Sequence, residues 1–110
     1  MPRIVDLKAA PYNLDEGQIQ WVEETLAEMT PDEQVGQLFT NLFFFGEDSF
    51  SGNPYTAEEI IEKFHIGVAR YHGGTSEKVQ ELLNRLQKAS KIPLLVAANC
   101  DSGGNGAMSD

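Results

Sequence analysis

Residues 66–98, IGVARYHGGTSEKVQELLNRLQKASKIPLLVAA, decide the fold class of this protein. A short apolar run from Ile66 to Tyr71 is followed by a glycine turn and then by a segment with apolar residues at helical spacing. A second apolar run, from Leu94 to Ala98, closes the stretch. Two strands joined through a helix pair in parallel by a right-handed crossover. The stretch therefore predicts an α/β fold with buried parallel strands.

The same alternation extends toward the amino terminus. A run of apolar residues over 38–45 predicts an earlier buried strand, and Thr56-x-x-Glu59 is a helix start signal between it and the next strand. Thr30-Pro31 begins a short helix, and Asp15, with Gln18 three residues later, begins a longer one. We expect an amino-terminal arm over residues 1–13 and one α/β domain over residues 14–110.

Length, charge and cysteine content limit the function. The 110 residues suit one small domain, and their net charge of −9 argues against a nucleic-acid or anionic-membrane surface. The apolar runs are too short to span a membrane, and the first residues do not resemble a signal peptide, so we expect a cytoplasmic protein. Cys100 is the single cysteine, which excludes an internal disulfide.

Polar residues follow each expected strand, and parallel α/β folds build their sites at the carboxyl ends of strands. Three clusters qualify: 41–48, 70–74 and 99–105. Asn99 and Asp101 form the best pair, because both can hydrogen-bond the hydroxyl groups of a sugar or another polyol. The alternative is that they only form an Asx-turn into Ser102-Gly103-Gly104.

Arg70 and His72 are weaker candidates for the same site. A histidine at a strand end can act as an acid, a base or a ligand donor, or it can be a hydrogen-bonded loop residue. His65 lies at the opposite end of the strand, where we expect a structural role. No second His or Cys stands at ligand spacing, so we expect no metal. The glycine loop at 103–106 lacks the third glycine of a dinucleotide fingerprint, so we expect no cofactor.

Several of these stretches together resemble the amino-terminal domain of glycoside hydrolase family 3, which contains β-glucosidases and β-N-acetylhexosaminidases. The resemblance rests on their order and spacing along most of the chain. The stretches are Met29–Leu38, His65–Tyr71, Ser76–Gln87, Ile92–Ala97 and the Gly103-Gly104 loop. The family ends its third strand in Asp-x-Glu-Gly-Gly, where this chain has Asn99-Cys-Asp101-Ser-Gly-Gly with one extra residue. The family's sugar-binding Asp therefore maps onto either Asn99 or Asp101.

The resemblance implies a (β/α)8 barrel of the TIM type, of which this chain forms the first three β/α units after an amino-terminal helix. It also implies retaining hydrolysis of terminal β-linked glucose or N-acetylhexosamine. In the family, the nucleophilic Asp and the proton donor come from later segments, so we expect no catalytic residue here and no activity of the isolated chain. The four substrate-binding candidates are Asn99, Asp101, His72 and Arg70.

Two further expectations follow from a three-stranded portion of a barrel. With neighbouring strands missing, the isolated chain is expected to self-associate or to need the rest of the barrel. An alternative class of function is a small non-catalytic α/β binding or assembly module, which would be a stable monomer.

Overall fold

The computed structural model describes residues 5–44, 54–101, 103–104 and 107–110. The chain divides into two compact units, residues Met1–Thr30 and Pro31–Asp110. The elements in chain order are α1 (Glu16–Glu28), α2 (Pro31–Gly36), β1 (Thr40–Phe44), α3 (Ala57–Phe64), β2 (Val68–His72), α4 (Ser76–Ala89) and β3 (Leu95–Ala98). In the described residues, no helix is both long and apolar enough to cross a membrane.

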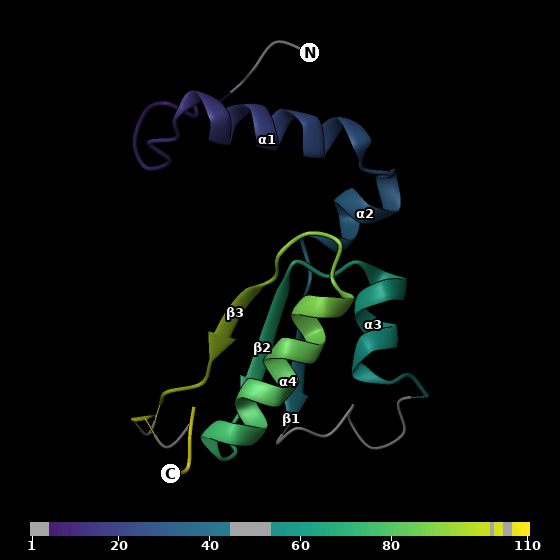
Figure 1. Ribbon diagram of the computed structural model, residues 1–110, viewed down its shortest axis with the longest axis vertical. Helices are drawn as coiled ribbons and strands as arrows, with labels where there is room; N and C mark the ends of the chain where they lie inside the picture. Colours follow the sequence, from purple (N-terminus) through teal and green to yellow (C-terminus); the bar gives the residue numbers. More distant parts are fainter. Residues whose placement is uncertain (1–4, 45–53, 102, 105–106) are drawn as a thin grey trace. The chain divides into compact units, whose positions relative to one another are not determined.

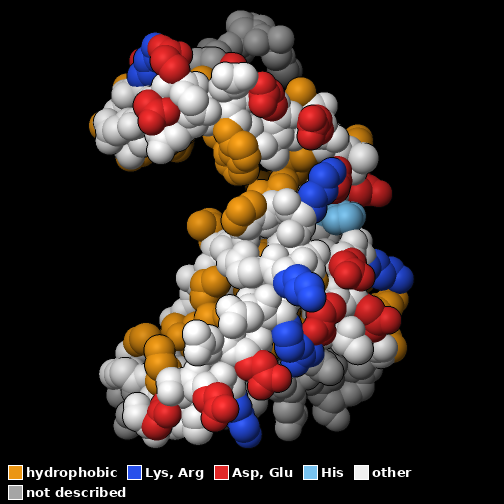
Figure 2. Space-filling view, viewed as in Figure 1, with side chains coloured by type: hydrophobic (Ala, Val, Ile, Leu, Met, Phe, Trp, Pro, Cys, Tyr) orange, Lys and Arg blue, Asp and Glu red, His pale blue; other side chains and the backbone are white. Residues whose placement is uncertain are grey.

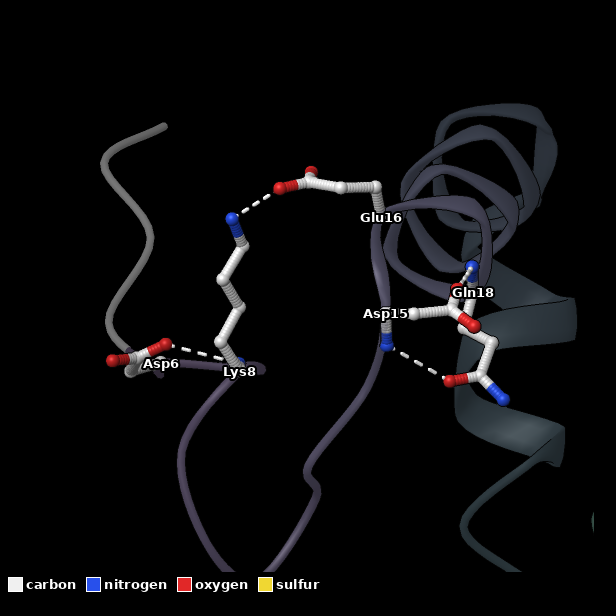
Figure 3. Close-up of polar contacts among 5 residues, drawn as sticks. All are labelled: Asp6, Lys8, Asp15, Glu16 and Gln18. Atoms are coloured by element: carbon white, nitrogen blue, oxygen red, sulfur yellow. Dashed lines mark hydrogen bonds and ion pairs between the residues drawn. The ribbon is translucent and has the colours of Figure 1, made fainter.

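The first unit consists of α1 and the segment that precedes it. The Asp15 carboxylate accepts a hydrogen bond from the Gln18 backbone N–H at 2.8 Å, and the Gln18 amide oxygen accepts one from the Asp15 N–H at 2.9 Å (Figure 3). This reciprocal pair satisfies two backbone donors that a helix start leaves free. The expected helix start is therefore confirmed. Lys8, in the segment that precedes α1, forms an ion pair with Glu16, the first residue of that helix (Figure 3).

The second unit is a three-stranded parallel sheet in the order β1-β2-β3, with a helix in each crossover (Figure 1). The register pairs Thr40 with Val68 at the start of β1 and Phe44 with His72 at its end. The expected α/β class and the parallel pairing are confirmed. The capping box of α3 at Thr56 and Glu59 is also present, with both reciprocal hydrogen bonds.

Helices α3 and α4 cover one face of this sheet. Phe43, Ala69 and Tyr71 occupy alternate positions on their strands, and all three are buried. They share one cluster with residues of α3 and α4; the helix residues of that cluster are Ala57, Ile60, Ile61, Val79, Leu82 and Leu86. Because side chains alternate along a strand, the residues between them lie on the opposite, open face.

Strand β3 is apolar but exposed, as we expect of a barrel portion whose neighbouring strands are missing. All four residues Leu95–Ala98 are exposed, with Leu95 at 71%. The apolar side chains along this strand are visible at the side of the molecule where β3 runs (Figures 1 and 2). The reason is that β3 is paired on one side only among the described residues, and it precedes no covering helix there. Apolar sequence marks a strand that is suited to burial, but burial itself requires neighbours.

The first strand is also shorter than expected. Leu38 and Phe39 precede β1 and are exposed, Leu38 at 85%. Phe45 and the loop expected over residues 46–53 lie outside the described residues. Within β1, Phe43 is completely buried, so the burial expected of this strand holds for the residue that faces the helices.

Candidate functional site: the carboxyl edge of the sheet

Two of the four candidate residues lie at the carboxyl ends of neighbouring strands. Tyr71 on β2 pairs with Ala98, the last residue of β3. His72 is the last residue of β2, and Asn99 directly follows β3. His72 is paired with Phe44 on its other side. His72 and Asn99 therefore both lie at the carboxyl edge of the sheet, at the ends of neighbouring strands. In parallel α/β folds this is the edge at which ligands bind.

Arg70 and His72 lie on the open face of the sheet. The burial of β2 alternates: Ala69 and Tyr71 are buried under the helices, whereas Val68, Arg70 and His72 are half-buried. Arg70 is paired with Ala97, and Asn99 follows two residues later and is half-buried as well. Alternation along β2 assigns Arg70 and His72 to the open face, and Asn99 lies just past the end of β3.

Asp101 occupies a different position from Asn99. It is exposed, and it lies within a turn that the Gly103 N–H closes by donating to the Cys100 carbonyl at 3.0 Å. A turn is the role that the alternative interpretation gave to this residue. The structure therefore separates the pair: Asn99 is at the sheet edge, and Asp101 is in the loop beyond it.

The last residues of the chain lie beside this edge, which the sequence did not predict. The Ser109 N–H donates to the carbonyl of Gly74 at 2.9 Å. The Asp110 side-chain carboxylate accepts hydrogen bonds from the backbone N–H and the hydroxyl of Ser76, both at 2.8 Å. These two donors hold the pKa of Asp110 below its ordinary value. No signal in the sequence links residues that stand 34 positions apart.

The remaining polar candidates do not join this group. Asn41 is half-buried on the helix-covered side of β1, and its amide donates to the carbonyl of Leu42 at 3.3 Å. Glu47 and Asp48, together with Ser102, Asn105 and Gly106, lie outside the described residues. His65 ends α3 at the amino edge of the sheet with a φ of 52°, which is the structural position that we expected.

The chemistry of the edge follows from its donor set. Arg70 supplies only hydrogen-bond donors, and the asparagine amide and a neutral imidazole each supply both a donor and an acceptor. Such a set suits a ligand with several hydroxyl groups. In the part of the chain that the structure describes, no three His, Cys, Asp or Glu side chains are grouped as a metal would require.

The fold defines the class of protein as a portion of a parallel α/β fold. Comparison with known proteins identifies the relatives within that class. The chain is 33% identical over 100 residues to a β-N-acetylglucosaminidase/β-glucosidase of Cellulomonas fimi, matching 91% of this chain and 17% of that protein. The sequence matches no protein-family model.

Solved structures also match enzymes that act on β-glucosides. The chain matches a β-glucoside phosphorylase bound to 2FGlc, with 37% identity and a TM-score of 0.78 over 94% of this chain and 18% of the phosphorylase. A second structure of a β-glucoside phosphorylase matches with 36% identity and a TM-score of 0.73, over 93% and 17% of the two chains. The chain is thus a partial homologue of enzymes of the glycoside hydrolase family 3 type, and it spans about one sixth of their length. The resemblance and the expected fold class are confirmed.

Proposed function

We propose that this chain forms the first three β/α units of the catalytic barrel of a retaining enzyme that cleaves terminal β-linked glucose or N-acetylhexosamine. Within that barrel, the carboxyl edge of the sheet binds hydroxyl groups of the sugar. Asn99, His72 and Arg70 make this contact from the open face, and Asp101 contributes from the loop. The isolated chain has no turnover.

The observation that carries this proposal is the position of His72 and Asn99 at the carboxyl ends of neighbouring strands, in a chain that is homologous to enzymes acting on β-glucosides. The carboxyl edge is the ligand-binding edge of a parallel barrel. The open face carries side chains of the size that fill a barrel interior, among them Val68 and Leu95. The half-buried polar residues at this edge support the proposal that it binds the ligand.

Retaining cleavage of a glycosidic bond needs two carboxyl groups about 5 Å apart, one as nucleophile and one as acid and base. The carboxyl edge described here supplies Arg70, His72 and Asn99, which are binding groups. The pair of carboxyl groups is assigned to the remaining five sixths of the homologous enzymes. Water or phosphate then accepts the sugar, since the homologues include a glucosidase and a phosphorylase.

A chimaera tests the proposal directly. The 110 residues replace the matched segment of the Cellulomonas fimi enzyme, and release of nitrophenol from aryl β-glucoside and aryl β-N-acetylglucosaminide is measured with and without phosphate. We expect turnover by the chimaera and none by the 110-residue chain. A folded chimaera without turnover on either substrate would contradict the proposal and favour a non-catalytic module. Turnover by the isolated chain would contradict the assignment of the catalytic carboxyl groups.

Single substitutions in the chimaera test the residues. Loss of a hydrogen bond to a substrate hydroxyl costs about 0.5–1.5 kcal/mol, and more when a charged group is involved. We therefore expect Asn99→Ala and His72→Ala each to lower kcat/KM by about threefold to tenfold or more. Asn84→Ala, on the exposed side of α4, serves as the matched control and is expected to leave kcat/KM unchanged. Unchanged kcat/KM in Asn99→Ala would return this residue to a turn-forming role.

A further inference from the structure

The segment after β3 leaves the sheet and returns to it. Its first attachment is the pairing of Ala98, the last residue of β3, with Tyr71 of β2. Its second attachment begins at Ser109, whose N–H donates to the Gly74 carbonyl at 2.9 Å. Both attachments are therefore made to the short stretch that runs from the end of β2 to the start of α4. The loop between them, residues 99–108, is tied at both ends to one place in the fold.

The second attachment is completed at a helix end. The Asp110 carboxylate accepts hydrogen bonds from both the backbone N–H and the hydroxyl of Ser76, each at 2.8 Å, where the chain end meets α4 (Figure 1). Ser76 is the first residue of α4, so its N–H is one of the donors that a helix start leaves without an intrahelical partner. Negative charge is also stabilised at a helix amino terminus. One charged acceptor thus meets two donors of a single residue, which fixes where the chain returns.

The loop between the two attachments has little else to hold it. A Cβ atom placed at Gly103 or Gly104 would meet nothing within 4 Å, so this part of the loop is not packed against the rest of the unit. Among the described residues of the loop, Ala107 packs against the buried core, but its single methyl group buries little surface. Glycine has more backbone freedom than any other residue, and tying the ends of a loop removes part of that freedom. The position of Asp101 therefore depends on the attachments.

We propose that Asp110 and Ser76 form a clasp that keeps this loop closed and thereby positions Asp101 beyond the carboxyl edge of the sheet. Asp110 is a positioning residue: it acts on the ligand through Asp101 and does not touch the ligand itself. The clasp stands on the contacts above, whereas the effect on the ligand rests on the proposed function, which gives Asp101 a sugar hydroxyl to bind. An open clasp leaves Asp101 to sample many positions, so the sugar binds more weakly.

Hydrogen exchange tests the clasp without any substrate. Protection factors of single backbone amides are measured in the 110-residue chain and in its Asp110→Ala variant. We expect protection of the Ser109 and Met108 amides to fall at least tenfold, and Ser76→Ala, which removes one of the two donors, to give a smaller loss. Glu77→Ala is the matched control, because it removes an exposed carboxylate from the same turn of α4. Equal protection in wild type and Asp110→Ala would overturn the clasp.

Kinetics of the chimaera test the positioning role. We expect Asp110→Ala to raise KM by about threefold to tenfold and to change kcat by less than about twofold, because the lost contact holds substrate and transition state alike. Asp110→Asn, which keeps one acceptor oxygen, should lie between this variant and wild type.

A double-mutant cycle separates positioning from a general structural effect. If Asp110 acts through Asp101, Asp110→Ala should raise KM no further in an Asp101→Ala background. An unchanged KM in Asp110→Ala, or an equal rise in both backgrounds, would overturn the positioning role while the chimaera remains active. A folded chimaera without turnover would instead contradict the proposed function, and with it the role of Asp101, and hydrogen exchange would still decide the clasp.

Discussion

The Gln87 side chain pairs with both backbone groups of Leu94. Its amide nitrogen donates to the Leu94 carbonyl at 2.9 Å, and its amide oxygen accepts from the Leu94 N–H at 3.0 Å. Leu94 is buried, and it immediately precedes β3. The side chain thus replaces the backbone partner that a neighbouring strand would provide, and it ties the end of α4 to the start of β3.

Removing this pair should destabilise the second unit. Gln87→Ala leaves both backbone groups of Leu94 without this partner, at a cost of about 1–3 kcal/mol in the free energy of unfolding. Urea denaturation followed by circular dichroism measures the change. Gln80→Ala, at an exposed position on the same helix, is the control and is expected to change stability by less than about 0.5 kcal/mol. Equal stability of the two variants would mean that water replaces the side chain without cost.

An ion pair between α3 and α4 should make stability depend on pH. Arg85 contacts both carboxylate oxygens of Glu58, at 2.6 and 2.9 Å, and its hydrogen bonds hold the pKa of Glu58 below the ordinary value of 4.5. A group whose pKa is lower in the folded than in the unfolded state stabilises the folded state at pH values above its unfolded pKa. This contribution to the free energy of unfolding is lost as the pH falls through the folded pKa. About one third of each side chain is exposed, so we expect Glu58→Gln to cost about 0.2–1 kcal/mol at pH 7.

The test is the difference in the free energy of unfolding between wild type and Glu58→Gln at pH 7 and at pH 3. We expect the difference to shrink at the lower pH, where the wild-type carboxyl group is protonated more often. Glu62→Gln, at an exposed position on the same helix, controls for the removal of a negative charge. A difference for Glu58→Gln that grows toward pH 3 would contradict this assignment.

A close backbone contact at the amino edge of the sheet should exclude any side chain at Gly36. A Cβ atom placed there would lie 2.1 Å from the Phe64 carbonyl oxygen and 2.8 Å from that of His65. Because these are backbone atoms, Gly36→Ala must shift the end of α3, and we expect a loss of about 1–3 kcal/mol or more. Gly104→Ala meets nothing within 4 Å and should be close to neutral. Thermal unfolding of both variants measures the two effects. An unaltered melting temperature in Gly36→Ala would contradict the expectation that a Cβ atom does not fit at this position.

Self-association of the isolated chain remains a prediction, and we expect the contact between chains to form at β3. Leu95 and Val96 lie exposed on β3, where an open edge can pair with another chain. We expect light scattering at micromolar concentration to show oligomers, and Leu95→Lys to reduce their fraction several-fold. Leu26→Lys, which changes an exposed leucine outside the sheet, should have little effect. A monodisperse wild-type monomer with cooperative unfolding would instead support the small binding module.

The sequence by itself determined the kind and order of the elements. The caps at Asp15 and Thr56 act through neighbouring residues, so their hydrogen bonds can be anticipated from spacing alone. Helices between short apolar strands required parallel pairing, because a crossover reverses the chain direction twice. The order of motifs was also enough to indicate the homologous enzymes.

The tertiary structure decided everything that depends on what stands beside a residue. Apolar composition predicted burial for Leu95, but burial needs neighbours, and β3 has one only on its β2 side among the described residues. The structure put Asn99 directly after β3, at the sheet edge, and Asp101 in a turn. No local pattern specifies this difference, because Asn and Asp are equally suited to either role. The contacts of Ser109 with Gly74 and of Asp110 with Ser76 have the same origin. They arise from long-range packing, which brings together segments whose sequences carry no mark of each other.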